Sequence, residues 1–270
     1  MIRRLLSVVL SSIVYLLNVK QIPAAALQTI VCYFCEMNIC SYIDHTILKP
    51  TTLISDVEMV CKEAIENNMA AVCVPPLFVK QARSLVQNSN VKVATVIGFP
   101  FGYSAVEAKL AEVLLAIVDG ADELDMVINI SALKNNDWQY LAGELNAVLP
   151  IIKSKKKVLK IIIESGLLTD DEIIKCCDLY GIAGVDFMKT STGYAETGAT
   201  VHAVKLMRKH LADAVKIKAS GGIRTYHFAK ELIDAGADRI GCSSSIKIIQ
   251  ESKNETNNFE DDTNKANETY

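Results

Sequence analysis

Charged side chains interrupt four stretches of the sequence that otherwise have the apolar composition of buried strands. The stretches are ELDMVIN, VLKIIIE, VDFMKTS and VKIKASGG, and the residues of interest in them are Asp125, Lys160, Lys189 and Lys218. An isolated buried ammonium group is costly, and it usually shifts its pKa and loses its proton. A lysine beside other cations and away from water can therefore attack a carbonyl and form a Schiff base. Lys189, which ends an apolar run and precedes a Thr, Ser and Gly cluster, is the first candidate for that role.

A buried ion-pair network that only specifies packing is the alternative interpretation for each of these residues taken alone. For three lysines and one aspartate together, a functional site is favoured, because ionisable groups with shifted pKa values gather at such sites. As a set they hold three cations and one carboxylate, an imbalance that would lower the pKa of a lysine. Further polar residues at predicted strand ends are Asp44, Cys73 and Glu164.

Glycine and hydroxyl residues follow the last three predicted strands. They form the segments TSTGY (190–194), SGGIRT (220–225) and GCSSS (241–245). Glycine lets backbone N–H groups approach an anion closely, and the last loops of a barrel commonly bind phosphate together with a helix N-terminus. Ordinary turn chemistry would explain any one of these loops. Two adjacent loops with Gly-Gly and Ser-Ser-Ser favour a phosphate site.

Repeated start and stop signals predict the elements that position these residues. Capping boxes predict helix starts at Ser55–Glu58, Ser104–Glu107 and Thr169–Glu172, and glycines suited to helix C-caps precede strands in DGADELDMVI, YGIAGVDFMK and DAGADRIGCS. Strands are predicted at about 42–46, 70–74, 92–98, 122–129, 157–163, 184–189, 214–219 and 238–242. Eight strands that alternate with helices in roughly 210 residues favour an α/β fold, the (β/α)8 TIM barrel. A doubly wound open sheet is the alternative, but it should show G-x-G-x-x-G after the first strand, and this sequence has none there.

Composition narrows the classes of partner. The chain has 28 basic and 31 acidic residues and a formal charge of −3, which argues against nucleic-acid binding because such proteins carry a basic patch. Its eight cysteines are scattered, so we interpret them as reduced thiols. Histidines and carboxylates do not occur at metal-ligand spacing, which disfavours a catalytic metal site. Of the histidines, we expect His45 to orient its neighbours at a strand end and His202 to lie on a helix surface.

The two ends of the chain differ from its centre. Residues 1–36 have a basic start and a hydrophobic run too short to span a bilayer, and we interpret them as a targeting segment or as an extension upstream of the natural start at Met37. Residues 37–250 form the predicted catalytic domain, and residues 251–270 have the polar composition of a disordered tail. We expect a cytoplasmic protein whose core does not bind membranes, with targeting by residues 1–36 as the alternative.

The whole core resembles one enzyme family. The segments that carry the resemblance are YIDHTILKP, VATVIGFPFG, GADELDMVINI, LKIIIESGLLTDDEI, FMKTSTG, IKASGGIRT and RIGCSSS, which cover about Met37 to Ile249 in order. They resemble deoxyribose-phosphate aldolase, a class I aldolase on a (β/α)8 barrel. The resemblance implies reversible cleavage of 2-deoxy-D-ribose 5-phosphate into acetaldehyde and D-glyceraldehyde 3-phosphate, without metal or cofactor. It also implies a role in deoxyribonucleotide catabolism, and we keep a homodimer as one candidate assembly.

The resemblance also implies roles for single residues. Lys189 would be the Schiff-base nucleophile, Lys218 would lower its pKa and transfer protons, and Asp125 would be a general acid/base that acts through water. Asp44, Thr46, Lys160 and Cys73 would surround these groups, with Lys160 holding the charge of the aspartate and Cys73 acting as a packed thiol. The residues implied in phosphate binding are Gly193, Gly221, Gly222, Gly241, Ser243 and Ser244.

Two other functions share some of these features. A barrel transaldolase or related lyase would also have a strand-end lysine and phosphate loops, but it would need room for a ketose donor. A catalytically inactive barrel that binds phosphate would not need Lys189, Lys218 and Asp125 together. Borohydride trapping with acetaldehyde, followed by peptide mapping, separates the three.

Overall fold

Eight parallel strands form a closed barrel in the computed structural model, which describes residues 38–255. The strands are β1 Ile43–Thr46, β2 Ala71–Val74, β3 Lys92–Ile97, β4 Glu123–Val127, β5 Val158–Ile162, β6 Phe187–Lys189, β7 Lys216–Ser220 and β8 Arg239–Cys242. Each strand pairs with the next along the chain, and β8 pairs with β1. The predicted (β/α)8 barrel is therefore confirmed, and the open-sheet alternative is wrong. The largest difference in position is at β6, which begins at 187 where 184 was predicted.

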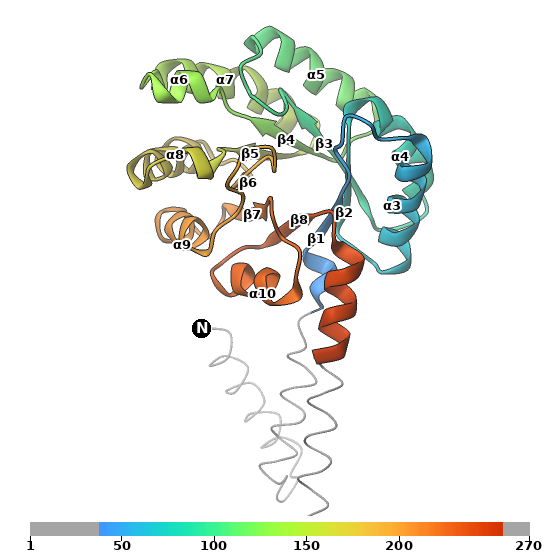
Figure 1. Cartoon of the computed structure of the whole chain (residues 1–270). Coiled ribbons are helices and arrows are strands. Elements are labelled where there is room, and N and C mark those ends of the chain that lie inside the picture. Colours follow the sequence, from blue (N-terminus) through green and yellow to red (C-terminus); the bar gives the residue numbers. More distant parts are fainter. Residues whose placement is uncertain (1–37, 256–270) are drawn as a thin grey trace, which may run out of the picture. The chain divides into compact units, whose positions relative to one another are not determined.

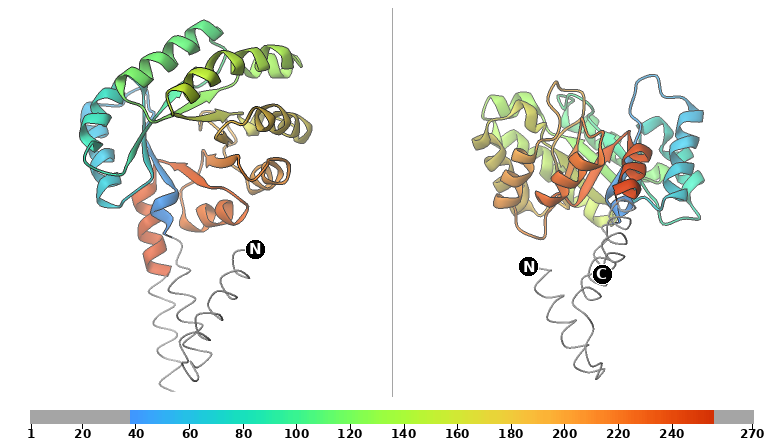
Figure 2. Two further views of the ribbon diagram at one scale, coloured as in Figure 1. Left: turned by 180° about the vertical axis from the view of Figure 1, so that it is seen from behind. Right: turned by 60° about the horizontal axis from the view of Figure 1, so that its bottom comes forward.

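Nearly every strand residue is buried, because side chains that point inward fill the barrel and those that point outward pack against helices. The helices are α3 Ile54–Glu66, α4 Val79–Val86, α5 Val106–Asp119, α6 Ile130–Lys134, α7 Trp138–Ser154, α8 Asp170–Ala183, α9 Val201–His210 and α10 Tyr226–Asp234. They lie around the strands (Figure 1), and two further views keep them on the outside (Figure 2). Short 3-10 helices occur at Ile39–Tyr42, Pro76–Phe78 and Ser165–Leu167.

One of the three predicted helix starts is confirmed. Thr169 caps α8, and its hydroxyl accepts the N–H of Glu172 while the Glu172 carboxylate accepts the N–H of Thr169. Ser55 lies inside α3, where Asp56 accepts the N–H of Leu53 at 2.8 Å and fixes an earlier start. The helix α5 begins at Val106, so Ser104 precedes the cap position and its hydroxyl does not cap the first turn.

A last helix spans residues 245–255 and follows β8 directly. Glu251 lies in it and accepts the N–H of Tyr226 at 2.7 Å, which ties the helix to the start of α10. The prediction of a disordered tail from residue 251 is therefore wrong for 251–255, because the helix continues through these residues and Glu251 ties it to α10. The predictions for residues 1–36 and for the rest of the tail lie outside the described residues. Within residues 38–255, no helix has the length and apolar character needed to cross a membrane.

A buried ion pair between the helices supports the strand that carries Asp125. The Lys109 ammonium of α5 donates to Glu144 of α7 at 2.5 Å and to the carbonyl oxygen of Val127, at the end of β4, at 2.7 Å. Both charged side chains are almost fully buried. Burial lowers the pKa of Lys109 and raises that of Glu144, and the attraction between the two opposes both shifts.

We expect Lys109→Met to lower the free energy of unfolding by about 3–5 kcal/mol, because it leaves Glu144 buried without its partner. The double variant Lys109→Met/Glu144→Leu should recover most of that loss, since it removes both charges and keeps most of the side-chain volume. Urea denaturation of the three proteins measures the effect. Equal stability of the single and double variants would show that the unpaired carboxylate is not the cause.

Candidate active site

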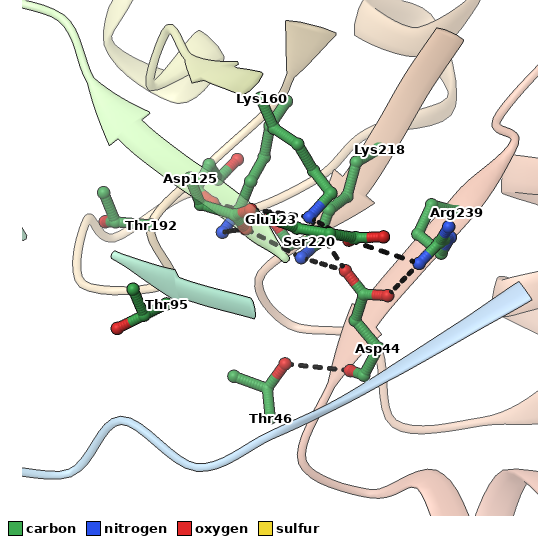
Figure 3. A network of polar contacts seen from close by, with 12 residues as sticks. Asp44, Thr46, Thr95, Glu123, Asp125, Lys160, Thr192, Lys218, Ser220 and Arg239 are labelled. Atoms are coloured by element: carbon green, nitrogen blue, oxygen red, sulfur yellow. Dashed lines mark hydrogen bonds and ion pairs between the residues drawn. The ribbon is translucent and has the colours of Figure 1, made fainter. Parts of the chain in front are cut away.

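The barrel interior contains a continuous network of charged side chains (Figure 3). Inward-pointing positions on neighbouring strands supply it: Asp125 pairs in register with Lys160, Lys189 with Lys218, and Lys218 with Arg239. Because strand side chains alternate between two faces, the register brings these groups to the same interior. The structure thus assembles the four charged residues singled out in the sequence.

Asp125 lies at the centre of the network and is fully buried. Its Oδ1 accepts the ammonium of Lys160 at 2.8 Å, and its Oδ2 accepts those of Lys189 at 2.9 Å and Lys218 at 2.7 Å. Burial alone would raise the pKa of Asp125, but the three lysines outweigh it and hold the pKa well below its ordinary value. Lys189 and Lys218 therefore meet on one carboxylate oxygen.

The sequence-based count of three cations and one carboxylate is wrong, because two more carboxylates and one more cation belong to the network. Asp44 contacts Lys218 and accepts the guanidinium of Arg239 at 2.5 Å. Glu123 lies 2.5 Å from the ammonium of Lys160 and 3.5 Å from the guanidinium of Arg239. The network therefore contains four cations and three carboxylates.

Lys189 is the cation in excess of the number of carboxylates in the network. The cations Lys160, Lys218 and Arg239 already balance Asp44, Glu123 and Asp125 in number. The pKa of Lys189 is lowered, mainly by burial and further by Lys218, while Asp125 opposes the shift. For Lys160 and Lys218 burial acts in the same direction, but the neighbouring carboxylates outweigh it and raise the pKa. Of these lysines, Lys189 thus loses its proton most readily.

Lys189 also lines a cavity of about 790 Å³ at the carboxyl ends of the strands. Asp125 and Lys218 are fully buried. Asp125 Oδ2 accepts from both Lys189 and Lys218, so it connects them to each other. The cavity wall brings together all the residues that the sequence assigned to phosphate binding: Gly193, Gly221, Gly222, Gly241, Ser243 and Ser244.

The glycine loops depend on backbone conformations that other residues rarely adopt. Gly193 and Gly221 have φ angles of +89° and +88°. A Cβ on Gly221 would lie 3.0 Å from the Cα of Gly198 and 3.3 Å from that of Gly193, so the loops after β6 and β7 approach each other closely here. Ser244 precedes the helix 245–255 and accepts the N–H of Ile248 through its backbone oxygen. Its position places a helix N-terminus beside the cavity.

Hydrogen bonds to β7 hold the segment that follows Lys189. Thr190 donates its hydroxyl to the carbonyl oxygen of Ser220 at 3.2 Å and accepts the N–H of Ser220 at 3.1 Å. The Ser220 hydroxyl donates to the carbonyl oxygen of Ser191 at 2.6 Å. These contacts give the Thr190 hydroxyl a structural role, whereas Ser191 contributes its backbone oxygen.

The structure also places the other residues singled out in the sequence. Thr46 lines the cavity and donates its hydroxyl to the carbonyl oxygen of Asp44 at 2.8 Å. Cys73 is fully buried, and burial raises its pKa to about 11, consistent with a packed thiol.

His45 lies 2.7 Å from Glu63 of α3 and also lines the cavity. His202 is exposed on α9 and pairs with Asp170. In the described range 38–255, no group of three or more metal-ligating side chains occurs.

Sequence reasoning missed Glu123 and Arg239. Glu123 lies two residues before Asp125, and residues two apart on a strand point to the same face, so this spacing could have identified it. Arg239 is the first residue of β8, where a charged side chain is easily interpreted as solvent-exposed. Its contact with Asp44 joins the first and last strands, and local sequence carries no sign of it.

Comparison with known proteins agrees with this geometry. The model of the DeoC/LacD family aldolases matches residues 39–251. A protein of Caldanaerobacter subterraneus subsp. tengcongensis named deoxyribose-phosphate aldolase is 47% identical over 80% of this chain and 94% of its own length. The crystal structure of a putative deoxyribose-phosphate aldolase from Coccidioides immitis has a TM-score of 0.77 and 38% identity, and covers 80% of this chain and 86% of its own. The tetrameric deoxyribose phosphate aldolase of Aeropyrum pernix has a TM-score of 0.75 and 32% identity, with 80% and 91% covered. The chain belongs to the DeoC/LacD family of aldolases.

Proposed function

We propose that this aldolase cleaves 2-deoxy-D-ribose 5-phosphate reversibly into acetaldehyde and D-glyceraldehyde 3-phosphate through a Schiff base on Lys189. The observation that carries the proposal concerns Lys189. It is the cation in excess of the carboxylates in the buried network, and it also lines the cavity. An amine in that position is neutral at lower pH than an ordinary lysine and can reach a ligand. The names of the relatives support the same substrate.

The proposed steps follow from the chemistry of an imine. The neutral amine of Lys189 attacks the C1 aldehyde of the open sugar, water leaves, and the resulting iminium withdraws electrons from the C2–C3 bond. That bond breaks as the C3 hydroxyl loses its proton, which releases D-glyceraldehyde 3-phosphate and leaves an enamine. Protonation at C2 and hydrolysis then release acetaldehyde and restore Lys189.

We propose that Asp125 and Lys218 move these protons. Asp125 would act as the general acid/base through water, and Lys218 would exchange protons with it. The shared contacts at Asp125 Oδ2, 2.9 Å to Lys189 and 2.7 Å to Lys218, support this assignment. Lys160 holds the other carboxylate oxygen at 2.8 Å and so fixes the orientation of the group.

The substrate phosphate is proposed to bind among the glycine and serine loops of the cavity wall. Positive-φ glycines turn the backbone there, and the helix 245–255 begins beside them. Three further cations, Lys49, Arg224 and Lys247, line the same cavity and favour an anion. The sugar would then extend from Lys189 toward these loops.

We expect Ser244→Glu to raise the KM for 2-deoxyribose 5-phosphate by about tenfold or more, because its carboxylate would repel the phosphate. The KM for unphosphorylated 2-deoxyribose should change far less. Ser244→Gln is the matched control, since it has nearly the same bulk without the charge. Steady-state kinetics with both sugars checks the expectation. An equal rise for both sugars in Ser244→Glu would place the phosphate elsewhere.

The experiment that tests the reaction itself is borohydride trapping. Incubation with acetaldehyde and borohydride should label the peptide that contains Lys189, and 2-deoxyribose 5-phosphate with borohydride should label the same peptide, because both aldehydes form an imine on the same amine. A transaldolase would need a ketose donor to form its imine, and an inactive barrel would form none.

Assembly and location stay predictions. The Aeropyrum pernix relative is described as a tetramer, and we keep a homodimer as one candidate assembly for this chain. Analytical ultracentrifugation of the full chain measures the state directly. The cytoplasmic location and the absence of nucleic-acid partners rest on the sequence composition.

A further inference from the structure

The carboxylate of Glu164 is buried beside the cavity and has no part in the steps above. Glu164 follows β5 and is only 3% exposed. Its backbone is left-handed, with φ +53° and ψ +57°, a conformation that residues other than glycine, asparagine and aspartate seldom adopt. A conformation of this kind persists only where its surroundings fix it, and it often occurs at functional sites.

Both carboxylate oxygens of Glu164 are used on one residue, Thr192. The backbone N–H of Thr192 lies 3.2 Å from each oxygen, and the Thr192 hydroxyl donates to Oε2. Burial raises the pKa of Glu164, while the two kinds of bond from Thr192 and the charge of Lys189 oppose the rise. The Thr192 hydroxyl is the donor in its contact with Oε2, so its proton points at Glu164.

This contact determines what Thr192 can offer to a ligand. A hydroxyl has one proton and two lone pairs. The proton is taken by Glu164, and one lone pair accepts the N–H of Tyr194 at 3.0 Å. Thr192 lines the same cavity as Lys189, so the remaining lone pair is available there as an acceptor. The charge of Glu164 strengthens that acceptor, because it polarises the O–H bond.

We infer that Glu164 is a positioning residue that fixes the Thr192 hydroxyl as a hydrogen-bond acceptor for a sugar hydroxyl between the imine and the phosphate. The inference rests on the proposed function. Thr192 lies between Lys189 and Gly193 in the chain, and all three line the cavity. The middle carbons of a sugar that extends from the nucleophile to the phosphate loops would therefore lie near Thr192. The C4 hydroxyl, which is not consumed in the reaction, is the donor that this acceptor would select.

The test compares two acceptor aldehydes in the addition of acetaldehyde. D-glyceraldehyde 3-phosphate carries the hydroxyl in question, and 3-phosphopropanal is the same chain without it. A site built to hydrogen-bond a hydroxyl rejects the analogue that lacks it, and we expect the wild-type protein to favour the hydroxylated aldehyde at least about 100-fold in kcat/KM. Thr192→Val should reduce this ratio by about tenfold or more, while Thr192→Ser, which keeps the hydroxyl, should stay within about threefold of wild type.

Glu164→Gln tests the carboxylate itself. The variant keeps the shape but removes the charge, and its amide nitrogen can donate to the Thr192 hydroxyl and turn that proton into the cavity. We expect the ratio to fall by about tenfold, with no further fall when Glu164→Gln is added to Thr192→Val. Glu164→Asn is a second variant in case Glu164→Gln does not fold, because asparagine adopts the left-handed conformation readily and its shorter side chain reaches Thr192 less well.

Borohydride trapping with acetaldehyde, which has no hydroxyl group, separates loss of positioning from general damage to the site. We expect the plateau rate of trapping, measured at alkaline pH where Lys189 is neutral in every variant, to stay within about twofold of wild type, because Lys189 itself is untouched. A wild-type protein that traps no acetaldehyde would overturn the proposed function, and the inference with it. A wild-type protein that traps acetaldehyde but adds both aldehydes equally well would overturn the inference alone. The same holds if Glu164→Gln and Glu164→Asn keep the wild-type ratio, or if Glu164→Gln lowers it equally in the Thr192→Val background.

Discussion

Lys189→Arg is expected to abolish the borohydride-trapped imine and to lower the rate of aldol cleavage by several orders of magnitude. Arginine keeps the positive charge, but its guanidinium stays protonated and forms no imine with an aldehyde. The loss should appear in kcat with both 2-deoxyribose 5-phosphate and unphosphorylated 2-deoxyribose, because the missing step is chemical and is the same for both sugars.

The matched control for Lys189→Arg is Lys189→Met, which removes the charge as well as the amine. Both variants should be inactive, but their stabilities should differ. Without a charge at position 189, Lys160, Lys218 and Arg239 still balance the three carboxylates of the network, whereas arginine there makes the surplus charge permanent. We therefore expect Lys189→Met to be the more stable variant in urea denaturation, by about 1–3 kcal/mol. Retained cleavage in either variant would show that another amine is the nucleophile.

The barrel was predictable because each of its elements is specified locally. Parallel strands covered by helices must be apolar on both faces, so apolar runs such as VATVIGF indicate strands. Glycines indicate the ends of helices. Gly120 and Gly184 do cap α5 and α8 in the left-handed conformation. The exact starts of helices were less predictable, because Asp56 and not Ser55 supplies the first contact of α3.

The members of the candidate site were largely predictable, but the balance of their charges was not. A lysine in an apolar run is visible in the sequence, and so is a Gly-Gly loop. The contact between Arg239 and Asp44 joins residues 195 positions apart, and it exists only because the barrel closes between β8 and β1. The role of Glu164 was hidden for a similar reason, since its partner Thr192 lies on the next loop of the barrel. Closure of the barrel, which no local pattern encodes, brings Asp44 to Lys218 and Arg239 and so adds a carboxylate to the network.

Lys218→Met is expected to move the acid limb of the pH profile for imine formation upward by at least about one pH unit. In the wild-type protein Lys218 disfavours the charged form of Lys189, which adds to the effect of burial. Without Lys218, only Lys160 and Arg239 remain to balance Asp44, Glu123 and Asp125. Lys189 then becomes the third cation that the carboxylates require, so its pKa rises and a smaller fraction is neutral at pH 7.

Acetaldehyde is the substrate for this measurement because it carries no phosphate, so a change in phosphate binding cannot alter the result. The rate of borohydride-trapped imine is recorded against pH in wild type and variant. Below the pKa of Lys189 the amine is protonated and the rate falls, so a raised pKa leaves the rate low at neutral pH and restores it under alkaline conditions. An unmoved acid limb would show that burial alone activates Lys189 and that Lys218 acts in another step.

The double variant Lys218→Met/Asp44→Asn distinguishes charge balance from simple loss of a neighbour. It removes one cation and one carboxylate, so Lys160 and Arg239 again balance the remaining Glu123 and Asp125, and Lys189 returns to being the surplus charge. If balance sets the pKa of Lys189, the acid limb should move back toward its wild-type position although Lys218 is still absent. If direct repulsion by Lys218 dominates, Asp44→Asn should leave most of the upward shift in place. The two explanations thus give different pH profiles for the same protein, and the buried network is small enough for one added substitution to separate them.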